Sequence, residues 1–169
     1  MRIFFGDLVH TWDKKGIWTF PLNVGLIATY AKKYLSKAGI DCNITIFKDP
    51  LKMISAIRKE KPHVVALSYY QWNSELNRKV HDIVRKDVPN TLNVGGGPNI
   101  TSLNANEKGA KKFFSRQKNC DAFVVNQGEK GFVELIKKFN EVNRDLDKLR
   151  RTVVPGSLIN DLKKHNKVY

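Results

Sequence analysis

Three short segments of this chain carry residue types that could bind a ligand. In Gly95-Gly96-Gly97 no side chain keeps a bulky or phosphate-bearing ligand away from the backbone. Tyr69 and Trp72 could stack on a flat ring, next to a small residue that leaves the backbone accessible. The candidate cofactor-binding residues of the three segments are Ser68, Tyr69, Trp72, Asn73, Gly95, Gly96, Gly97, Pro98, Gly128 and Glu129.

Each segment also has a purely structural interpretation. Asn73 could cap a helix, and Glu129 would interact favourably with a helix N-terminus in the absence of any ligand. The glycines do not form a P-loop, because no Lys-Ser or Lys-Thr follows them, and no Gly-x-Gly-x-x-Gly follows the first expected strand. A turn rarely needs three consecutive glycines, so we interpret Gly95 to Gly97 as functional.

The sequence offers no recognisable set of catalytic or metal-binding residues. Its histidines are scattered, and only His10 is expected at the ligand-binding end of the fold. No Cys/His spacing suits zinc, and no nucleophile lies beside a base in an identifiable motif. Cys42 and Cys120 could form at most one disulfide bond. We therefore predict neither catalytic nor metal-ligating residues in this chain.

Apolar runs that alternate with amphipathic segments predict the fold class. Strands are expected at 3–5, 44–46, 64–67, 91–94 and 122–125, and helices are expected to start near Pro21, Pro50, Asn73, Glu107 and Glu129. This alternation is typical of a Rossmann-like (flavodoxin-like), doubly wound α/β fold with five parallel strands in the order 2-1-3-4-5. Ligands of such folds bind beyond the carboxyl ends of the strands, where the three candidate segments would lie.

Two further segments stand out by their length and charge. The long first loop, from Gly6 to Phe20, contains Trp12 and Trp18, which could form a wall against a flat ligand or a self-packed lid. After residue 140 the chain becomes highly charged, with a short hairpin or extended arm at 153–159. We expect a cofactor-binding domain over residues 1–140 and a charged linker or arm, leading toward a following domain, over 141–169.

Composition limits the class of protein. The 169 residues are 41% hydrophobic, which suits one ordinary domain with a real core. No signal peptide is evident and no stretch approaches the roughly 18 apolar residues of a membrane span, so a cytoplasmic location without membrane contact is expected. The 30 Lys and Arg exceed the 16 Asp and Glu, but they are spread over the whole chain. Nucleic acid is thus a minor alternative partner.

The segments Phe20-Pro21-Leu22-Asn23-Val24-Gly25, Leu67 to Asn73, Gly95 to Asn99 and Val125 to Glu129 resemble a known family. Together they look like the N-terminal cobalamin (vitamin B12)-binding domain of cobalamin-dependent radical S-adenosylmethionine enzymes. The resemblance covers about residues 1 to 140. It implies a Rossmann-like domain that holds cobalamin against the strand ends, at the candidate residues named above. In the family, a following radical domain often performs methyl transfer or ring rearrangement.

The same resemblance limits what this chain does alone. The segment Asp7-Leu8-Val9-His10 lacks the Asp-x-His-x-x-Gly spacing whose His binds cobalt in cobalamin mutases, which implies a cobalt face without a protein histidine. Two cysteines cannot supply a Cys-x-x-x-Cys-x-x-Cys cluster motif. S-adenosylmethionine and a 4Fe-4S cluster would therefore belong to a radical domain, in cis or in trans, of a parent enzyme such as a methyltransferase. The alternatives are a flavin- or nucleotide-binding flavodoxin-like protein and a basic RNA-associated module.

Overall fold

A six-stranded parallel sheet forms the centre of the molecule. The computed structural model describes residues 1–10, 20–99 and 106–157. The strands are β1 (Arg2–Gly6), β2 (Asn43–Phe47), β3 (Val64–Ser68), β4 (Leu92–Gly96), β5 (Ala122–Val125) and β6 (Thr152–Pro155), in the order β2-β1-β3-β4-β5-β6. The main helices are α1 (Leu22–Lys37), α2 (Pro50–Glu60), α3 (Ser74–Asp87), α4 (Glu107–Arg116) and α5 (Gly128–Glu141). A short 3-10 helix, η2 (Gln71–Asn73), precedes α3.

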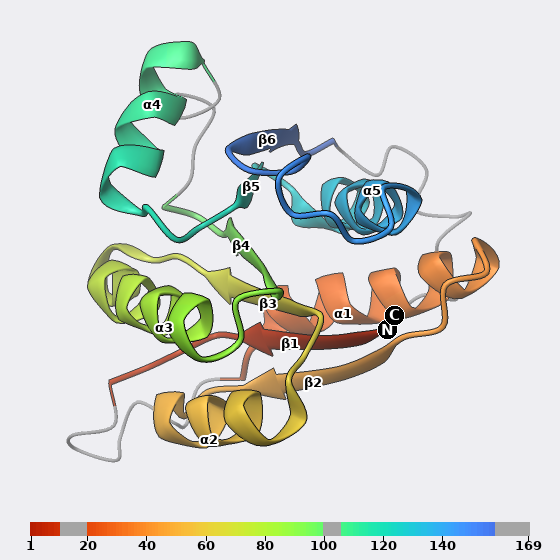
Figure 1. The fold of residues 1–169 in the computed structure, drawn as a ribbon, viewed down its shortest axis with the longest axis horizontal. Coiled ribbons are helices and arrows are strands. Elements are labelled where there is room, and N and C mark those ends of the chain that lie inside the picture. Colours follow the sequence, from red (N-terminus) through yellow and green to blue (C-terminus); the bar gives the residue numbers. More distant parts are fainter. Residues whose placement is uncertain (11–19, 100–105, 158–169) are drawn as a thin grey trace.

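Helices cover both faces of the sheet. Figure 1 shows α1 and α5 on one face and α2 and α3, with α4 beyond them, on the other. The first face is packed by apolar residues such as Phe5, Ala31 and Phe132, and the second by residues such as Phe4, Met53 and Phe123. Strand β3 is buried along its whole length, which agrees with a continuous apolar run between two helical layers.

The predicted fold class is confirmed, and the strand number is corrected from five to six. The order of the first five strands is the expected one, with β2 at the edge and β3 between β1 and β4. The additional strand β6 lies parallel to β5, with Ala122 opposite Thr152 and Val125 opposite Pro155. Residues 152–155 therefore belong to the sheet and form neither a hairpin nor a detached arm.

Strand β4 and helix α3 differ in detail from the prediction. Strand β4 continues through Gly95 and Gly96, so that only Gly97 lies in the loop. Asn73 occupies the N-cap position of α3, but its side chain makes no capping hydrogen bond to that helix. Within the described residues, no helix has the length and apolar character needed to cross a membrane.

Candidate functional site

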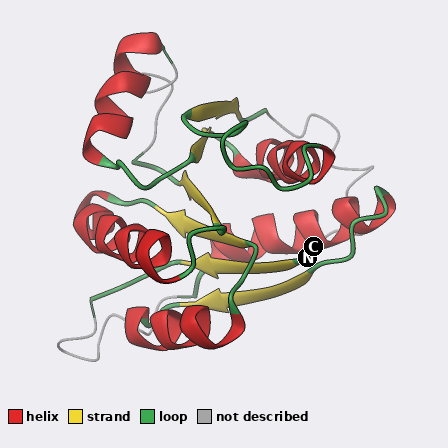
Figure 2. Cartoon of the chain, in the orientation of Figure 1, coloured by secondary structure: helices red, strands yellow, loops and turns green. Residues whose placement is uncertain are grey.

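A cleft lies at the carboxyl edge of the sheet, between the ends of β1, β3, β4 and β5 and the first turns of α1 and α5. Figure 2 shows these strands side by side with helices on both faces of the sheet. It encloses about 470 Å³ not occupied by protein atoms, part of it open to solvent. The lining comprises Phe5, Asn23, Val24, Ile27, Ala66, Leu67, Ser68, Val94, Gly95, Gly96, Gly97, Val124, Asn126, Gly128 and Phe132. A mostly apolar wall with a few polar groups is typical of a cofactor site.

Gly96, the last residue of β4, leaves one wall of the cleft without a side chain. A Cβ added at Gly96 would meet nothing nearer than the Val124 carbonyl oxygen, at 3.7 Å. The position is therefore open, and a ligand can approach the strand backbone there. Gly97 is different, because its φ of +101° strains any other residue and its Cβ would lie 2.8 Å from Ser68 Oγ. The backbone conformation therefore requires glycine at position 97, whether or not a ligand binds.

Gly128 serves the packing of the two helices that frame the cleft. A Cβ at this position would lie 2.7 Å from Cδ1 of Ile27 on α1. The Ile27 side chain therefore fills the space beside Gly128 and would have to turn aside for a larger residue there. Polar groups in the lining come from Ser68, Asn23 and Asn126, the last with a left-handed φ of 62°.

Buried amides hold the loop after β3 in place. The Asn73 side-chain amide donates hydrogen bonds to the carbonyl oxygens of Leu8 and Ser68, both at 3.0 Å, and its oxygen accepts from the Tyr70 N–H at 2.8 Å. Asn77 donates a second hydrogen bond to the Ser68 carbonyl, also at 3.0 Å. Asn73 is fully buried and does not line the cleft. Its hydrogen bonds instead position the loop that follows Ser68.

The side chain of Tyr69 points away from the cleft. It is 1% exposed, and its hydroxyl lies 3.1 Å from His81 Nδ1 and 3.3 Å from Gln117 Oε1. Burial raises the pKa of Tyr69 well above its usual value and lowers the pKa of His81 to about 3. Both groups are therefore neutral at physiological pH, and in this arrangement the Tyr69 ring does not face a ligand in the cleft.

The remaining predicted residues lie outside the cleft lining. Trp72 is 64% exposed and stacks on Tyr70, with ring centroids 4.5 Å apart. Pro98 is exposed directly after Gly97, and Glu129 is half-buried in the first turn of α5. Sequence reasoning thus placed Ser68, Gly95 to Gly97 and Gly128 where the structure brings them together.

The first loop lies mostly outside the described residues, including Trp12 and Trp18. Phe20 at its end is 79% exposed. His10 is exposed, and its Nε2 lies 3.1 Å from the Trp72 carbonyl oxygen. The described residues contain no group of three or more His, Cys, Asp or Glu side chains that could hold a metal ion.

Sequence reasoning missed the apolar floor of the cleft. Phe5 pairs in register with Ala66, and Ala66 with Val94, so their side chains share one face of the sheet. Val124 and Phe132 complete this floor. The period-two alternation within each strand carried the signal, but only the register between strands shows which residues meet.

The fold is that of a doubly wound α/β domain with a cleft at the carboxyl edge of its sheet. The family model described as the B12 binding domain matches residues 24–136, and the chain belongs to this family. Over 142 residues it is 31% identical to a cobalamin-dependent radical SAM methyltransferase, TokK, of Streptomyces tokunonensis. It is 32% identical to a 2-(S-pantetheinyl)-carbapenam-3-carboxylate methyltransferase of Streptantibioticus cattleyicolor.

Both alignments cover 80% of this chain but 18% of the relative. The chain thus spans about a fifth of the length of these methyltransferases. Among solved structures, the cobalamin-dependent S-adenosylmethionine radical enzyme OxsB matches 83% of this chain and 19% of its own, with TM-score 0.62 and 14% identity. A cobalamin-binding protein from Desulfitobacterium hafniense matches 82% of this chain and 58% of its own, with TM-score 0.53 and 15% identity. At these identities the structural matches show the fold alone.

Proposed function

We propose that this chain binds cobalamin in the cleft at the carboxyl edge of the sheet. The observation that carries the proposal is the bare position of Gly96, which faces an apolar cleft in a chain of the B12-binding family. A macrocycle needs a wall that it can approach closely over a wide area, and a glycine strand end provides such a wall.

The cleft lining fits one part of this cofactor, because it combines an apolar floor with a few polar side chains. Cobalamin carries a broad corrin ring with peripheral amides and a nucleotide tail. It exceeds the cleft, which would accept one part while the rest covers the strand ends. Ser68, Asn23 and Asn126 would pair with its polar groups, and the apolar floor would exclude water. Bound cobalamin supplies a cobalt centre that can accept and release a methyl group.

The other predicted contacts take different positions in this proposal. Trp72, Pro98 and Glu129 remain candidates for contacts at the rim, because each adjoins a segment that reaches the cleft. The side chains of Tyr69 and Asn73 would not contact the cofactor and would position the loop after β3. We further propose that no protein histidine binds the cobalt, since His10 does not line the cleft.

We also propose that the chain acts with a radical S-adenosylmethionine domain, in cis or in trans. Support comes from the two methyltransferase relatives, of which this chain matches only the cobalamin-binding share. S-adenosylmethionine and a 4Fe-4S cluster would be held by that other domain. Methyl transfer would be the activity of the whole assembly, in the cytoplasm.

The test is a spectroscopic titration of the purified chain with aquacobalamin. We expect saturable binding that Gly96→Val weakens by more than about tenfold, because valine fills the open wall. The matched control is Gly25→Val on α1, where an added Cβ meets nothing within 4 Å. Unchanged affinity in Gly96→Val would contradict this cleft, and binding of flavin or RNA in place of cobalamin would contradict the function.

The cobalt ligand is tested on the same complex. Electron paramagnetic resonance of bound cob(II)alamin should be the same for the wild type and His10→Ala. Loss of an axial nitrogen splitting in the variant would show that His10 binds the metal.

A further inference from the structure

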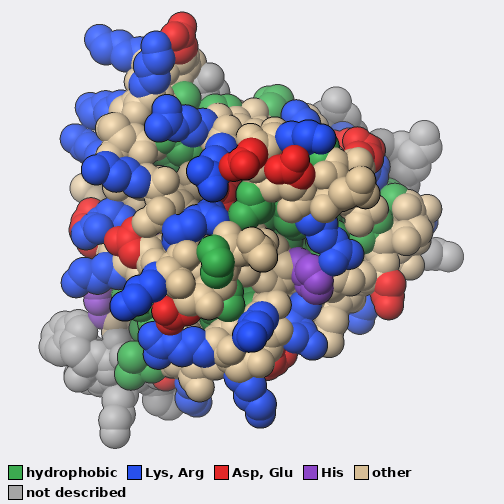
Figure 3. Space-filling view, viewed as in Figure 1, with side chains coloured by type: hydrophobic (Ala, Val, Ile, Leu, Met, Phe, Trp, Pro, Cys, Tyr) green, Lys and Arg blue, Asp and Glu red, His purple; other side chains and the backbone are tan. Residues whose placement is uncertain are grey.

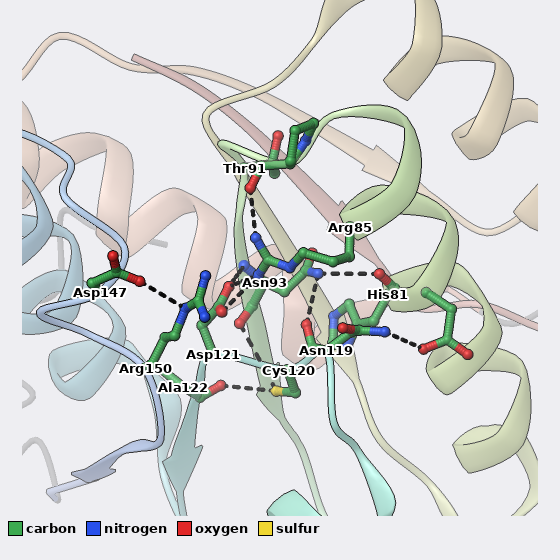
Figure 4. Close-up of polar contacts among 12 residues, drawn as sticks. His81, Arg85, Thr91, Asn93, Asn119, Cys120, Asp121, Ala122, Asp147 and Arg150 are labelled. Atoms are coloured by element: carbon green, nitrogen blue, oxygen red, sulfur yellow. Dashed lines mark hydrogen bonds and ion pairs between the residues drawn. The ribbon is translucent and has the colours of Figure 1, made fainter.

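A second concave site lies at the amino-terminal edge of the sheet, opposite the cobalamin cleft. It encloses about 470 Å³, part of it open to solvent. Its polar lining comes from α3, from the turns before β5 and before β6, and consists of Arg85, Lys118, Asn119, Asp121, Arg150 and Arg151. Figure 4 shows Asp121 between the side chains of Arg85 and Arg150.

Positive charge in this site exceeds negative charge by a wide margin. Four cationic side chains line it against one carboxylate, that of Asp121. Asp121 is already engaged, because both its oxygens accept from Arg85 Nη2 at 2.6 Å and one also accepts from the Asn93 N–H at 2.8 Å. Asp121 is therefore already paired with Arg85, and its single negative charge cannot balance four positive ones.

Two of the cations have no partner within the part of the chain that the structure describes. No hydrogen bond or ion pair there engages the Lys118 ammonium or the Arg151 guanidinium. Arg150 pairs through Nε with Asp147 at 3.1 Å, in an exposed ion pair that leaves its terminal nitrogens unengaged. Such pairs contribute little to stability, so the side chain can turn toward a ligand.

The turn before β6 brings Arg150 and Arg151 to the pocket, and its backbone conformation is unusual at Arg151. Arg151 has a φ of 61°, in the left-handed region that a residue other than glycine rarely adopts. The next residue, Thr152, fixes it by donating its N–H to the Asp121 carbonyl at 3.1 Å. Buried Leu149 anchors the turn from the other side. This turn brings Arg151 into the lining of the pocket.

We propose that this pocket binds a phosphate group, either inorganic phosphate or a phosphate monoester. Helices α3 and α4 end at this edge with the negative ends of their dipoles, so the backbone does not attract an anion here. The side chains must supply the attraction. Guanidinium groups suit phosphate oxygens because their donors are planar and can bind in pairs. Arg85 contributes charge while it holds Asp121, and Lys118, Arg150 and Arg151 supply the donors.

The shape of the site favours a compact dianion over a polymer. The cations converge on a pocket, whereas the basic side chains along α3 and α4 are spread over a convex side of the molecule (Figure 3). A nucleic acid would use that spread surface and would need no pocket. The proposal concerns a site at the opposite edge from the cobalamin cleft and does not depend on cobalamin binding.

The experiment is a titration of the 169-residue chain with inorganic phosphate at constant ionic strength, followed by calorimetry and by amide chemical shifts. We expect saturable binding that shifts the amides near Asn119 and Arg151. The double variant Lys118→Gln/Arg151→Gln should bind at least about tenfold more weakly, through the loss of charge-assisted hydrogen bonds. Both side chains are exposed, so folding should be retained.

A matched double variant separates the pocket from general electrostatics. Lys108→Gln/Lys112→Gln removes the same charge from exposed positions of α4 outside the pocket, and phosphate affinity should stay within about twofold. Equal weakening in both double variants, or no saturable binding by the wild type, would overturn the proposal. Binding of a short single-stranded RNA without a response to phosphate would also overturn it.

Discussion

The backbone N–H of Tyr69 donates to the Gly96 carbonyl oxygen at 2.6 Å, and this contact joins the loop after β3 to the glycine end of β4. The Tyr69 carbonyl in turn accepts from the Asn99 N–H at 2.9 Å. The two segments that form the open wall of the cleft are therefore one hydrogen-bonded unit. The side chain of Tyr69 anchors that unit on the opposite face of the sheet, beside His81.

Gly97→Ala should destabilise the chain by about 1–3 kcal/mol, because alanine is strained at a φ of +101°. The new Cβ would also lie 2.9 Å from the Tyr69 nitrogen, which belongs to the backbone and cannot turn aside. Urea denaturation measures the loss. Gly96→Ala is the control, since its Cβ enters open space, and it should change the free energy of unfolding by less than about 1 kcal/mol. Equal effects would refute the distinction between the two glycines.

Tyr69→Phe should lower stability by about 1–3 kcal/mol while cobalamin affinity stays within about twofold. The hydroxyl lies beside His81 Nδ1 and Gln117 in the core, where lost partners are not replaced by water. Denaturation and cofactor titration of one preparation measure both quantities. Tyr70→Phe, at a partly exposed neighbour, should change stability little. A tenfold loss of affinity without loss of stability would instead show that the Tyr69 hydroxyl contacts the cofactor.

Stability should fall as the pH falls from about 6.5 toward 3, in part because of His81. Burial lowers the pKa of this residue from 6.5 to about 3, so in that interval the unfolded chain binds a proton that the folded chain does not. The contribution reaches about 1.4 kcal/mol per pH unit. Asp121 acts in the opposite sense, because burial raises its pKa in the folded state.

The comparison of wild type with His81→Gln isolates the histidine, since Asp121 is present in both proteins. The free energy of unfolding, measured by urea at several pH values, should depend less steeply on pH in the variant. His10→Gln, at an exposed histidine, is the control. Parallel curves for wild type and His81→Gln would show that His81 does not titrate as its burial implies.

Gly156→Ala should detach β6 from the sheet, at a cost on the order of 2 kcal/mol. Its Cβ would lie 2.1 Å from the carbonyl oxygens of both Val125 and Gln127, and the Gly156 N–H hydrogen bond to Val125 would be lost. Hydrogen exchange of the β6 amides and urea denaturation measure the effect. Gly25→Ala should stabilise the chain, as alanine is the better helix former. Unchanged exchange in Gly156→Ala would contradict the position of the sixth strand.

The chain alone should not cleave S-adenosylmethionine after anaerobic reconstitution with iron and sulfide. Its two thiols, Cys42 and Cys120, are buried at the amino-terminal ends of β2 and β5, and burial raises the pKa of each. Thiols in such surroundings do not readily become the thiolate ligands that a cluster requires. Liquid chromatography would detect 5′-deoxyadenosine. Catalytic amounts that disappear in Cys42→Ser/Cys120→Ser would contradict the proposal.

The sequence predicted the structure well at positions where the residue types are compatible with only one environment. The continuous apolar run at Val64 to Leu67 predicted a strand buried on both faces, and β3 is such a strand. All three glycines of the triplet line the cleft, and the close approach of a ligand that they predicted stays a prediction.

The direction of individual side chains could not be predicted in the same way. Adjacent positions of an extended chain point to opposite faces, so Ser68 reaches the cleft while Tyr69 does not, and a shift of one residue would exchange them. The sequence did not predict strand β6, because this strand is four residues long, ends in proline and follows a charged segment. Its place depends on pairing with β5, which no local pattern reveals.

The direction of β6 sets the route by which the polypeptide leaves the sheet. A parallel last strand carries the chain to the carboxyl edge, and Gly156 is pinned there against Val125, two residues from Gln127 and the cleft helix α5. An antiparallel strand at the same place would have released the chain among the arginines at the far end. The described part of the chain therefore ends, at Ser157, toward the edge of the sheet that carries the cleft and away from the edge that carries the arginines.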